Sequence, residues 1–410
     1  MKKPTATVIT YVLVLALFCS ASIYAFADKN TVSDEENRSL QRRPTFSASD
    51  WFSGSFAGQM NSFFLDHVFN RDQFIAFAQF AERVFQRKMA ANVVSGNADG
   101  GNGGNPENTA LPSLETEYML LDDRILPIFR YDSSLCDTFA DVASIFFGNL
   151  PEGTNQYMMI APGRIAFEAP EYAENSDDQK TAIEHVYDRM NAQVMTVDAY
   201  AALEAHAAEL EKLYFRLDHH WTHLGAYYGA QALWKTLGMD YRPIEQYVPE
   251  QGPSYLGYLY AVTGSQDYAN QSDELIYYLY NGDVGSEMSY EPGEDAGQPL
   301  NQVSGAIIDP SRGGYYTYVD SVFAYAVLKG EKRDGSCLLV VGDSYINALA
   351  SWLTVNYETV IVIDPRYYDR GRSGILELCS QYHVTDALIM NYTVSLDSAY
   401  YIGCLSELTR

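Results

Sequence analysis

The stretch "CLLVVGDSYINALASWL", residues 337–353, decides the fold. It begins with an uninterrupted apolar run, which predicts a strand buried on both faces of a sheet. Gly342 allows a tight turn, and the apolar residues of 345–353 recur with helical spacing. A buried strand that leads directly into a helix is the repeating unit of parallel, doubly wound sheets.

The same alternation continues on both sides of this stretch. Downstream, strand patterns in "TVIVIDP" (359–365) and "DALIMNY" (386–392) flank a helical pattern in "GILELCSQY" (374–382). Upstream, predicted strands at 156–162, 194–198 and "LYFRLD" (213–218) alternate with predicted helices at 137–147, 179–193 and 201–212. Thr222 and Gly238 are typical caps of one more helix. We therefore expect an α/β fold with a doubly wound, mostly parallel sheet flanked by helices.

Composition divides the chain into three regions. Residues 1–27 hold Lys2, Lys3 and then an uncharged run, which predicts a signal peptide or a retained membrane anchor. Residues 28–112 read as a polar arm, a helical pattern at 49–89 and a Gly/Asn-rich loop at 95–109. Residues 113–410 form the α/β domain, which starts with a hairpin at 118–126 and carries a Tyr/Gly-rich insertion at 240–335. The export signal places the domain outside the cytoplasm, secreted, periplasmic or anchored at the outer face of the cytoplasmic membrane.

Charge and cysteine spacing exclude some classes of partner. The formal net charge is −26, so the chain repels phosphate backbones, and nucleic acid is not expected as a partner. Contact with a membrane is expected only through the N-terminal segment. The cysteines at 136, 337, 379 and 404 show no CxxC spacing, which argues against zinc and favours buried thiols. We expect no metal and no cofactor.

Ser344 is the candidate nucleophile. It follows the predicted strand 337–342 and starts the next helix, where the carboxyl edge of the sheet and the helix N-terminus meet. A serine there can attack a substrate if a base reaches it, and its own N–H can help to bind the oxyanion. The alternative is that Asp343 or Ser344 merely caps the helix.

The segment "DHHWTH", residues 218–223, supplies a base and a group to orient it. If the segment is extended, Asp218 and His220 face one pocket and His219 faces away. A carboxylate beside an imidazole fixes the tautomer that a general base needs. Trp221 either packs beneath the imidazole, lines an acceptor groove or belongs to the core. The rival interpretations are a metal site that uses His219 and His223, and a manganese phosphoesterase of the DHH type.

The sequence resembles a known family at several points. "RLDHHWTHLGAYYGAQAL" resembles the defining motif of the DHHW proteins, which are similar to the SGNH-hydrolase-like domains of alginate O-acetylation proteins. "ENRSLQRRPTF", "MMIAPGRIAFE" and "VIDPRYY" resemble other segments of the family, and the Asp-His-Trp segment precedes the GDS serine in the same order. The resemblance implies an SGNH-like fold and a Ser344, His220 and Asp218 triad. Further candidates for oxyanion or substrate binding are Gly342, Asp343, Asn391, Arg366, Tyr367 and Trp221.

The resemblance also implies a function. We expect an exported serine-dependent O-acetyltransferase or acetylesterase that acts on a cell-surface or secreted polysaccharide, with a membrane-bound O-acyltransferase as the source of acetyl groups. Acceptor choice, water or a sugar hydroxyl, is not decided by the sequence. Two alternatives remain open: a non-catalytic carbohydrate-binding or assembly component that keeps the fold, and a metallohydrolase built on the histidine cluster.

Overall fold

The computed structural model describes residues 32–33, 38–39, 42–47, 51, 55–67, 93–96, 116–280, 288–292, 306–319 and 323–410. The chain forms two compact units. One comprises Met1–Ala91, Gly96–Glu115 and Ala261–Ser265, and the other comprises Asn92–Ser95, Thr116–Tyr260 and Gln266–Arg410.

The first unit contains one well-formed helix among its described residues, α3 (Ser55–Asp66). Phe63 of this helix is buried, and Phe56, Met60 and Phe64 are half-buried, in keeping with the helical aromatic pattern. Strands β1 (Val32–Ser33) and β2 (Arg38–Ser39) pair antiparallel. The predicted signal or anchor at 1–27 and most of the Gly/Asn-rich loop lie outside the described residues. Within the described part of the chain, no helix has the length and hydropathy needed to cross a membrane.

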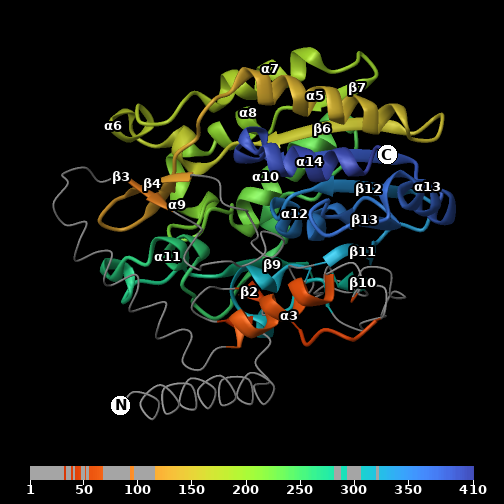
Figure 1. Ribbon diagram of the computed structural model, residues 1–410. Helices are drawn as coiled ribbons and strands as arrows, with labels where there is room; N and C mark the ends of the chain where they lie inside the picture. The colour runs from red at the N-terminus through yellow and green to blue at the C-terminus, as the bar shows by residue number, and fades with distance from the viewer. Residues whose placement is uncertain are drawn as a thin grey trace, which may run out of the picture. The chain divides into compact units, whose positions relative to one another are not determined.

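The second unit is built on a mostly parallel sheet of seven strands, as predicted (Figure 1). Its order is β10-β11-β13-β12-β14-β6-β7, and β11 runs antiparallel to both of its neighbours. The remaining pairs are parallel. The strands are β6 (Asn155–Ala161), β7 (Val194–Val197), β10 (Met288–Pro292), β11 (Phe323–Lys329), β12 (Cys337–Gly342), β13 (Thr359–Ile363) and β14 (Asp386–Tyr392).

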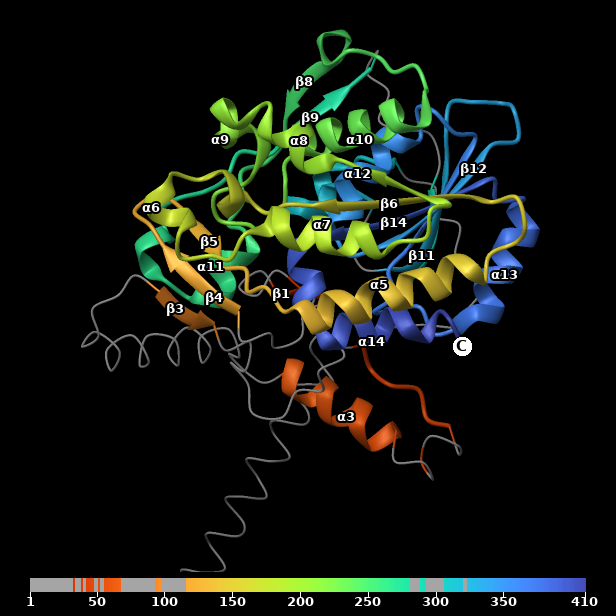
Figure 2. The ribbon, with the colours of Figure 1, turned by 90° about the horizontal axis from the view of Figure 1, so that it is seen from above.

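Helices cover both faces of this sheet. Figure 2 shows α5, α7 and α14 on one face and α8, α10 and α12 on the other. The longer helices are α5 (Ser133–Gly148), α7 (Gln179–Arg189), α10 (His223–Leu237), α12 (Tyr345–Leu353), α13 (Gly371–Tyr382) and α14 (Ala399–Glu407). The shorter ones are α6 (Pro170–Ala173), α8 (Ala199–Glu204), α9 (Leu210–Leu213) and α11 (Tyr258–Thr263). The sheet is therefore buried on both sides, which explains the uninterrupted apolar runs of its central strands.

Local signals in the sequence fix several helix ends. Thr222 caps α10 by accepting a hydrogen bond from the Gly225 N–H, and Gly238 ends the helix at a φ of 65°. The predicted helix 201–212 is wrong as a single element. It is split into α8, a 3-10 turn at Ala207–Glu209 and α9, because the chain leaves helical geometry at His206.

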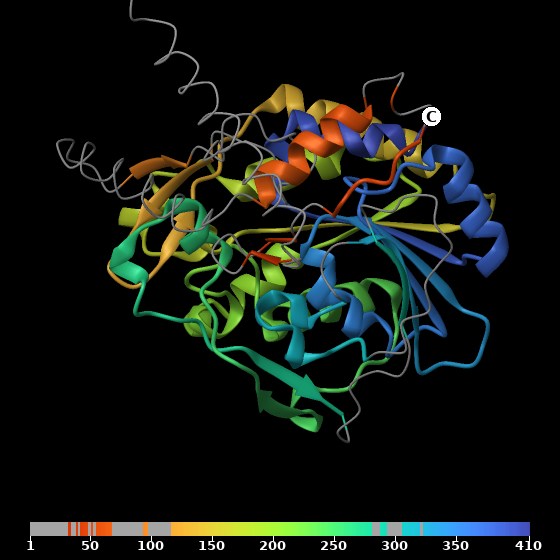
Figure 3. The same cartoon turned by 60° about the horizontal axis from the view of Figure 1, so that its bottom comes forward.

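The segments outside the main sheet form small sheets of their own. The predicted hairpin is confirmed as β4 (Thr116–Leu120) and β5 (Ile125–Pro127), with β3 (Val93–Gly96) as the third strand. In the predicted insertion, β8 (Val248–Gln251) pairs with β9 (Ile276–Leu279) as a separate ribbon, shown in green (Figure 3). Farther along the insertion, Gly314–Thr317 forms a 3-10 turn.

The cysteines among the described residues are free thiols. Cys136, Cys337 and Cys379 are buried, and Cys404 is half-buried. Burial raises the pKa of the Cys136 thiol to about 11. These cysteines are therefore packing residues, in agreement with their spacing in the sequence.

Candidate active site

Ser344 lies between the end of β12 and the start of α12. Its side chain does not cap the helix, and its Oγ lies 2.7 Å from Nε2 of His220. Its backbone N–H has no hydrogen-bond acceptor among the described residues. Helix capping therefore does not explain this serine, whose hydroxyl contacts a base and whose N–H remains free to donate.

Asp218 binds the other side of the same imidazole. Its Oδ1 lies 2.6 Å from Nδ1 of His220 and also accepts the His220 backbone N–H at 3.0 Å. This contact assigns the ring proton to Nδ1 and leaves Nε2 free to accept the Ser344 hydroxyl proton. The structure thus brings the three residues singled out by the sequence into one hydrogen-bonded array, Asp218–His220–Ser344.

The carboxyl group of Asp218 is held ionised. Burial by itself would raise its pKa, but the charge and the hydrogen bond of His220, with smaller contributions from His219 and the Tyr258 N–H, lower it well below the usual range. The Tyr258 N–H donates to Oδ2 at 3.1 Å. A buried carboxylate with both oxygens engaged is suited to orient an imidazole and to stabilise its charged form.

The segment before Asp218 is not the predicted strand. Tyr214 makes an isolated bridge to Trp221, and the Phe215 N–H donates to the His220 carbonyl at 3.3 Å. The carboxylate of Asp273 accepts the N–H groups of Arg216 at 3.0 Å and Leu217 at 2.7 Å. The carbonyls of Arg216 and Leu217 accept the N–H groups of Ile125 and Leu259. Because these partners lie outside a strand ladder, the segment can bend where a sheet strand would stay extended.

This bend corrects the expected direction of His219. Its ring centroid lies 3.9 Å from that of His220, and its Nδ1 lies 3.7 Å from Oδ1 of Asp218. His219 therefore packs beside the array and does not face away from it. The alternation rule failed because it assumes an extended backbone.

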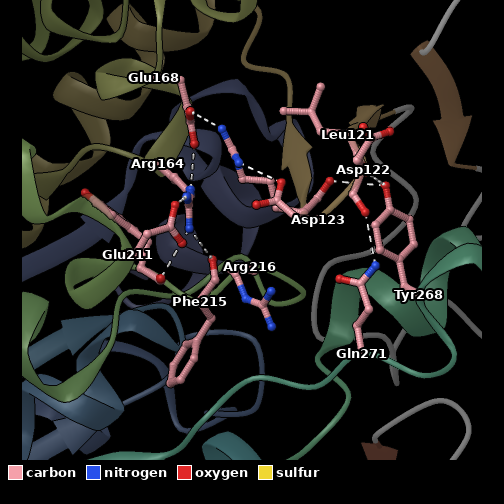
Figure 4. A network of polar contacts seen from close by, with 12 residues as sticks. Leu121, Asp122, Asp123, Arg164, Glu168, Glu211, Phe215, Arg216, Tyr268 and Gln271 are labelled. Carbon is pink, nitrogen blue, oxygen red and sulfur yellow. Dashed lines mark hydrogen bonds and ion pairs between the residues drawn. The ribbon is translucent and has the colours of Figure 1, made fainter.

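A chain of ion pairs supports the same segment (Figure 4). Arg164 is buried, binds Glu168 at 2.7 Å and also pairs with Glu211, while its Nη1 approaches the carbonyls of residues 214 and 215. Arg124 of the β4–β5 hairpin joins Glu168 at 2.8 Å. On the other side of the hairpin, Tyr268 donates to the Leu121 carbonyl and Gln271 to that of Asp122. The hairpin is thereby tied both to the segment that leads into Asp218 and to the insertion.

The insertion itself supplies three residues that the sequence analysis missed. Tyr258 binds Asp218 through its N–H, Asp273 holds the segment before Asp218, and Tyr315 stacks on the His220 ring. The one local signal was the pair Gly313-Gly314 before Tyr315, with φ values of 76° and 50°. Such a pair predicts a sharp turn, but it does not say what the following side chain will contact.

Asp343 and Asn391 belong to a buried network. Oδ2 of Asp343 accepts from the N–H of Tyr392 at 2.8 Å and from the hydroxyl of Ser395 at 2.6 Å. The Asn391 amide donates to the same oxygen at 3.1 Å and to the Tyr401 hydroxyl at 2.6 Å. Both amide protons are thus in use, so the prediction of Asn391 as an oxyanion donor is wrong. These residues anchor the Ser344 turn to the end of β14.

Arg366 and Trp221 occupy different environments. The Arg366 side chain is 3% exposed and binds Asp364 at 2.5 and 2.9 Å, but its Nη1 has no partner among the described residues. The guanidinium carbon of Arg366 lies 5.6 Å from the centroid of the Tyr367 ring.

Trp221 is fully buried and donates to the Tyr345 carbonyl at 3.1 Å. Trp221 is therefore a core residue, and Tyr315 takes the place beside the imidazole.

A metal site could use Asp218, His219 and His220, or a set that includes His223. One carboxylate oxygen of Asp218 and one ring nitrogen each of His219 and His220 lie within 4.8 Å of one another. Carboxylate and imidazole groups at this spacing are of the type that can bind a cation. Asp218 and His220, however, already share the 2.6 Å hydrogen bond of the array. His223 takes no part, since its Nδ1 accepts the Tyr278 N–H at 3.0 Å and its Nε2 contacts Ser351 Oγ at 2.8 Å.

His219 and His223 are buried histidines, and we expect them to make the folded protein less stable in acid. Burial lowers the pKa of both His219 and His223 to about 3, with the charge of His220 a further cause at His219. An unfolded histidine titrates near pH 6.5, so between about pH 6.5 and 3 the unfolded state binds more protons. We expect each residue to lower the free energy of unfolding by roughly 2 kcal/mol as the pH falls from 7 to 5. Urea denaturation at several pH values measures this loss.

The matched variant is His223→Gln. The unfolding free energy of this variant should depend less steeply on pH over this range. The difference in slope should correspond to at most one fewer proton taken up on unfolding. Asp397 acts in the opposite direction, because burial raises its pKa to about 6, but it is present in both proteins and cancels in the comparison. Equal slopes for the variant and the wild type would contradict a neutral, buried His223.

Comparison with known proteins identifies the family. The family model described as DHHW protein matches residues 92–363. A DHHW family protein from Eubacterium siraeum DSM 15702 superposes with a TM-score of 0.59 at 23% identity, covering 70% of this chain and 94% of that one. Bacillus cereus PatB1, solved with a sulfonyl adduct, gives a TM-score of 0.56 at 14% identity and covers 70% and 96%.

More distant matches add little. The O-acetyltransferase domain of Pseudomonas putida AlgJ covers 70% of this chain and 96% of its own at 15% identity, but its TM-score of 0.39 is too low to support an argument. No curated protein matches the sequence. The fold is shared with the E. siraeum and PatB1 structures, and the family match spans the Asp218–His220–Ser344 array. This chain belongs to the DHHW protein family.

Proposed function

We propose that this chain is a serine-dependent O-acetyltransferase or acetylesterase that works through an acetyl-Ser344 intermediate. The observation that carries the proposal is the continuous array from Oδ1 of Asp218 through His220 to Oγ of Ser344, with contacts of 2.6 and 2.7 Å. A serine bound to a neutral imidazole, itself oriented by a carboxylate, is the arrangement used for acyl transfer on unrelated folds.

The reaction proceeds in two half-reactions. Nε2 of His220 takes the Ser344 proton while Oγ attacks the acetyl carbonyl of an ester donor. The bond to the donor oxygen breaks, that oxygen receives the proton from His220, and the acetyl group remains on Ser344. An acceptor hydroxyl or water then gives its proton to His220, takes the acetyl group and returns Ser344 to its starting state.

Two groups are suited to bind the oxyanion. The first is the free N–H of Ser344 at the start of α12. The second is Arg366. Val341 of β12 pairs with Ile363 of the parallel strand β13. Ser344 and Arg366 each lie three residues after this pair, so both follow the same edge of the sheet. The unpartnered Nη1 of Arg366 is a buried donor at this edge, and we propose it as the second oxyanion donor.

The family resemblance and the N-terminal sequence support a proposal for the substrate and the location. We propose a cell-surface or secreted polysaccharide as the acceptor, a membrane-bound O-acyltransferase as the source of acetyl groups, and a site of action outside the cytoplasm. The basic and apolar start of the chain supports export. The sulfonyl adduct of PatB1 supports the choice of a sulfonyl fluoride as a probe, because such reagents capture activated nucleophiles.

The test compares wild type with Ser344→Ala in the full-length protein. We expect the variant to lose aryl acetate hydrolysis by about 10³-fold or more, since removal of the nucleophile leaves only binding and oxyanion contributions. Peptide mass spectrometry should find an acetyl or sulfonyl group on Ser344 of the wild type.

Ser351→Ala is the matched control. Its Oγ also contacts a histidine, at 2.8 Å, but that ring accepts a backbone N–H on its other nitrogen, so it holds its proton on Nε2 and cannot act as a base. Activity should persist in this variant. A wild type that neither releases acetate nor takes a label on Ser344 contradicts the proposal. Activity that survives Ser344→Ala but not EDTA would point instead to a metal at Asp218, His219 and His220.

A further inference from the structure

Tyr315 lies face to face with the imidazole of His220. The ring centroids are 3.7 Å apart, and the planes differ by 7°. Tyr315 is 5% exposed, so its ring is held between the base and the protein interior. The other rings near His220, His219 and Tyr345, meet it at 35° and 44°, and neither lies parallel to it.

The position of Tyr315 is fixed by its own segment. Gly313 and Gly314 have positive φ values of 76° and 50°, and they turn the chain so that the following 3-10 turn presents Tyr315. A Cβ on Gly314 would approach the Tyr255 ring to 3.0 Å, so the turn is closely packed. Phe215 and Tyr318 meet the Tyr315 ring at 90° and 68°. The ring therefore has little freedom to rotate or withdraw.

Tyr315 also contacts the helix that begins at Ser344. Its hydroxyl oxygen accepts the backbone N–H of Ala348 in α12 at 3.4 Å. One side chain thus touches the imidazole of His220 through its ring and, through its hydroxyl, the helix that follows Ser344. No other described residue of the insertion has this pair of contacts.

We propose that Tyr315 is a positioning residue for the reaction at Ser344, an inference that rests on the proposed function. Its ring keeps the imidazole plane aligned so that Nε2 points at Oγ of Ser344. Its π face also favours the imidazolium that forms when the serine proton is transferred, as an aromatic face does for a cation stacked on it. The insertion then contributes to catalysis as well as to the surface around the site.

Other groups near His220 act on the same charge. Asp218 favours the imidazolium through its hydrogen bond, whereas His219 is neutral and Tyr345 is a ring at an angle. The Arg366 guanidinium interacts electrostatically with both His219 and Asp343. All of these remain in place when Tyr315 is changed, so a change in pH dependence reports on the stacked ring.

The experiment compares Tyr315→Leu with Tyr315→Phe in the full-length protein. Phenylalanine keeps the stacked ring and loses one long hydrogen bond, so kcat for aryl acetate hydrolysis should stay within about threefold of wild type. Leucine removes the π face, and kcat should fall by about tenfold or more with KM little changed. The acidic limb of the pH–rate profile should move to lower pH in the leucine variant alone.

Tyr357→Leu controls for lost packing. Tyr357 is also a fully buried tyrosine, but it lies just before β13, at the opposite end of the parallel strands from Ser344. It should lower the urea midpoint about as much as Tyr315→Leu without moving the acidic limb. An unmoved limb and unchanged kcat in Tyr315→Leu, or equal losses in the phenylalanine and leucine variants, would overturn the proposal.

A second measurement separates this inference from the proposed function. The Nδ1 proton of His220, shared with Asp218, should give a downfield NMR resonance in wild type and in Tyr315→Phe. In Tyr315→Leu it should broaden, because the ring can reorient. This readout needs no turnover. If the wild type is inactive but the resonance follows this pattern, the function fails and the positioning role stands; if the resonance stays sharp in the leucine variant, the positioning role fails.

Discussion

Asp218→Asn is expected to lower kcat for aryl acetate hydrolysis by about 10³- to 10⁴-fold, the effect of holding a catalytic imidazole in the wrong tautomer. Both oxygens of the buried carboxylate accept hydrogen bonds, one from His220 at 2.6 Å and the other from the Tyr258 N–H at 3.1 Å. An amide has only one acceptor. With its oxygen toward Tyr258, its NH₂ faces Nδ1 and forces the ring proton onto Nε2, where it blocks the transfer from Ser344.

Asp137→Asn is the matched control. Its carboxylate also contacts a histidine, His185, at 2.8 Å, but on helices α5 and α7 and outside the Ser344 array. This change should leave kcat unaltered. Steady-state kinetics on both variants, with circular dichroism to verify folding, makes the comparison. A folded Asp218→Asn protein that keeps more than a tenth of the wild-type kcat would show that Asp218 does not orient the base.

Gly342→Ala is expected to lower the free energy of unfolding by about 3 kcal/mol or more, as overpacking against an immobile backbone does. Gly342 pairs with Met390 in the parallel β12–β14 ladder. A Cβ at this position would lie 1.8 Å from the Met390 carbonyl oxygen, which is itself part of the sheet. Relief would require the two central strands to separate next to Ser344, so activity should fall together with stability.

Gly403→Ala in α14 is the control for this substitution. Apart from the chain neighbours and the backbone of its own helix, no atom of the described residues lies within 4 Å of the Cβ that it would add. Alanine there should be neutral or stabilise by up to about 1 kcal/mol, because glycine is a poor helix former. Urea denaturation measures both changes. A wild-type midpoint for Gly342→Ala would mean that the strands are less closely packed at the serine turn than the structure indicates.

Much of the fold was accessible from local patterns. The boundaries of α12 at Tyr345–Leu353 and of β14 at Asp386–Tyr392 agree with the predicted segments, because apolar periodicity and end signals are written into consecutive residues. The caps of α10 at Thr222 and Gly238 were read correctly for the same reason. Where the period of the sequence was clear, the element was correctly placed.

The errors fall where contacts are made between distant residues. The "LYFRLD" segment has the composition of a strand, yet its backbone binds Asp273, more than fifty residues later, and it bends. Asn391 ends a strand at the right edge, yet both of its amide protons are taken by Asp343 and Tyr401. Neither outcome can be read from neighbouring residues, because hydrogen-bond partners are chosen by the tertiary fold.

By itself, the sequence determined the alternation of strands and helices, the turn that carries Ser344 and the local pairing of Asp218 with His220, since all three depend on residues close together in the chain. Only the tertiary structure decided the antiparallel insertion of β11 into the sheet and the approach of His220 to Ser344 across 124 positions. It also decided the convergence of Tyr258, Asp273 and Tyr315 on that array. The physical reason is that apolar periodicity specifies which face of an element is buried, whereas the partner of that face is set by packing the whole chain around one core.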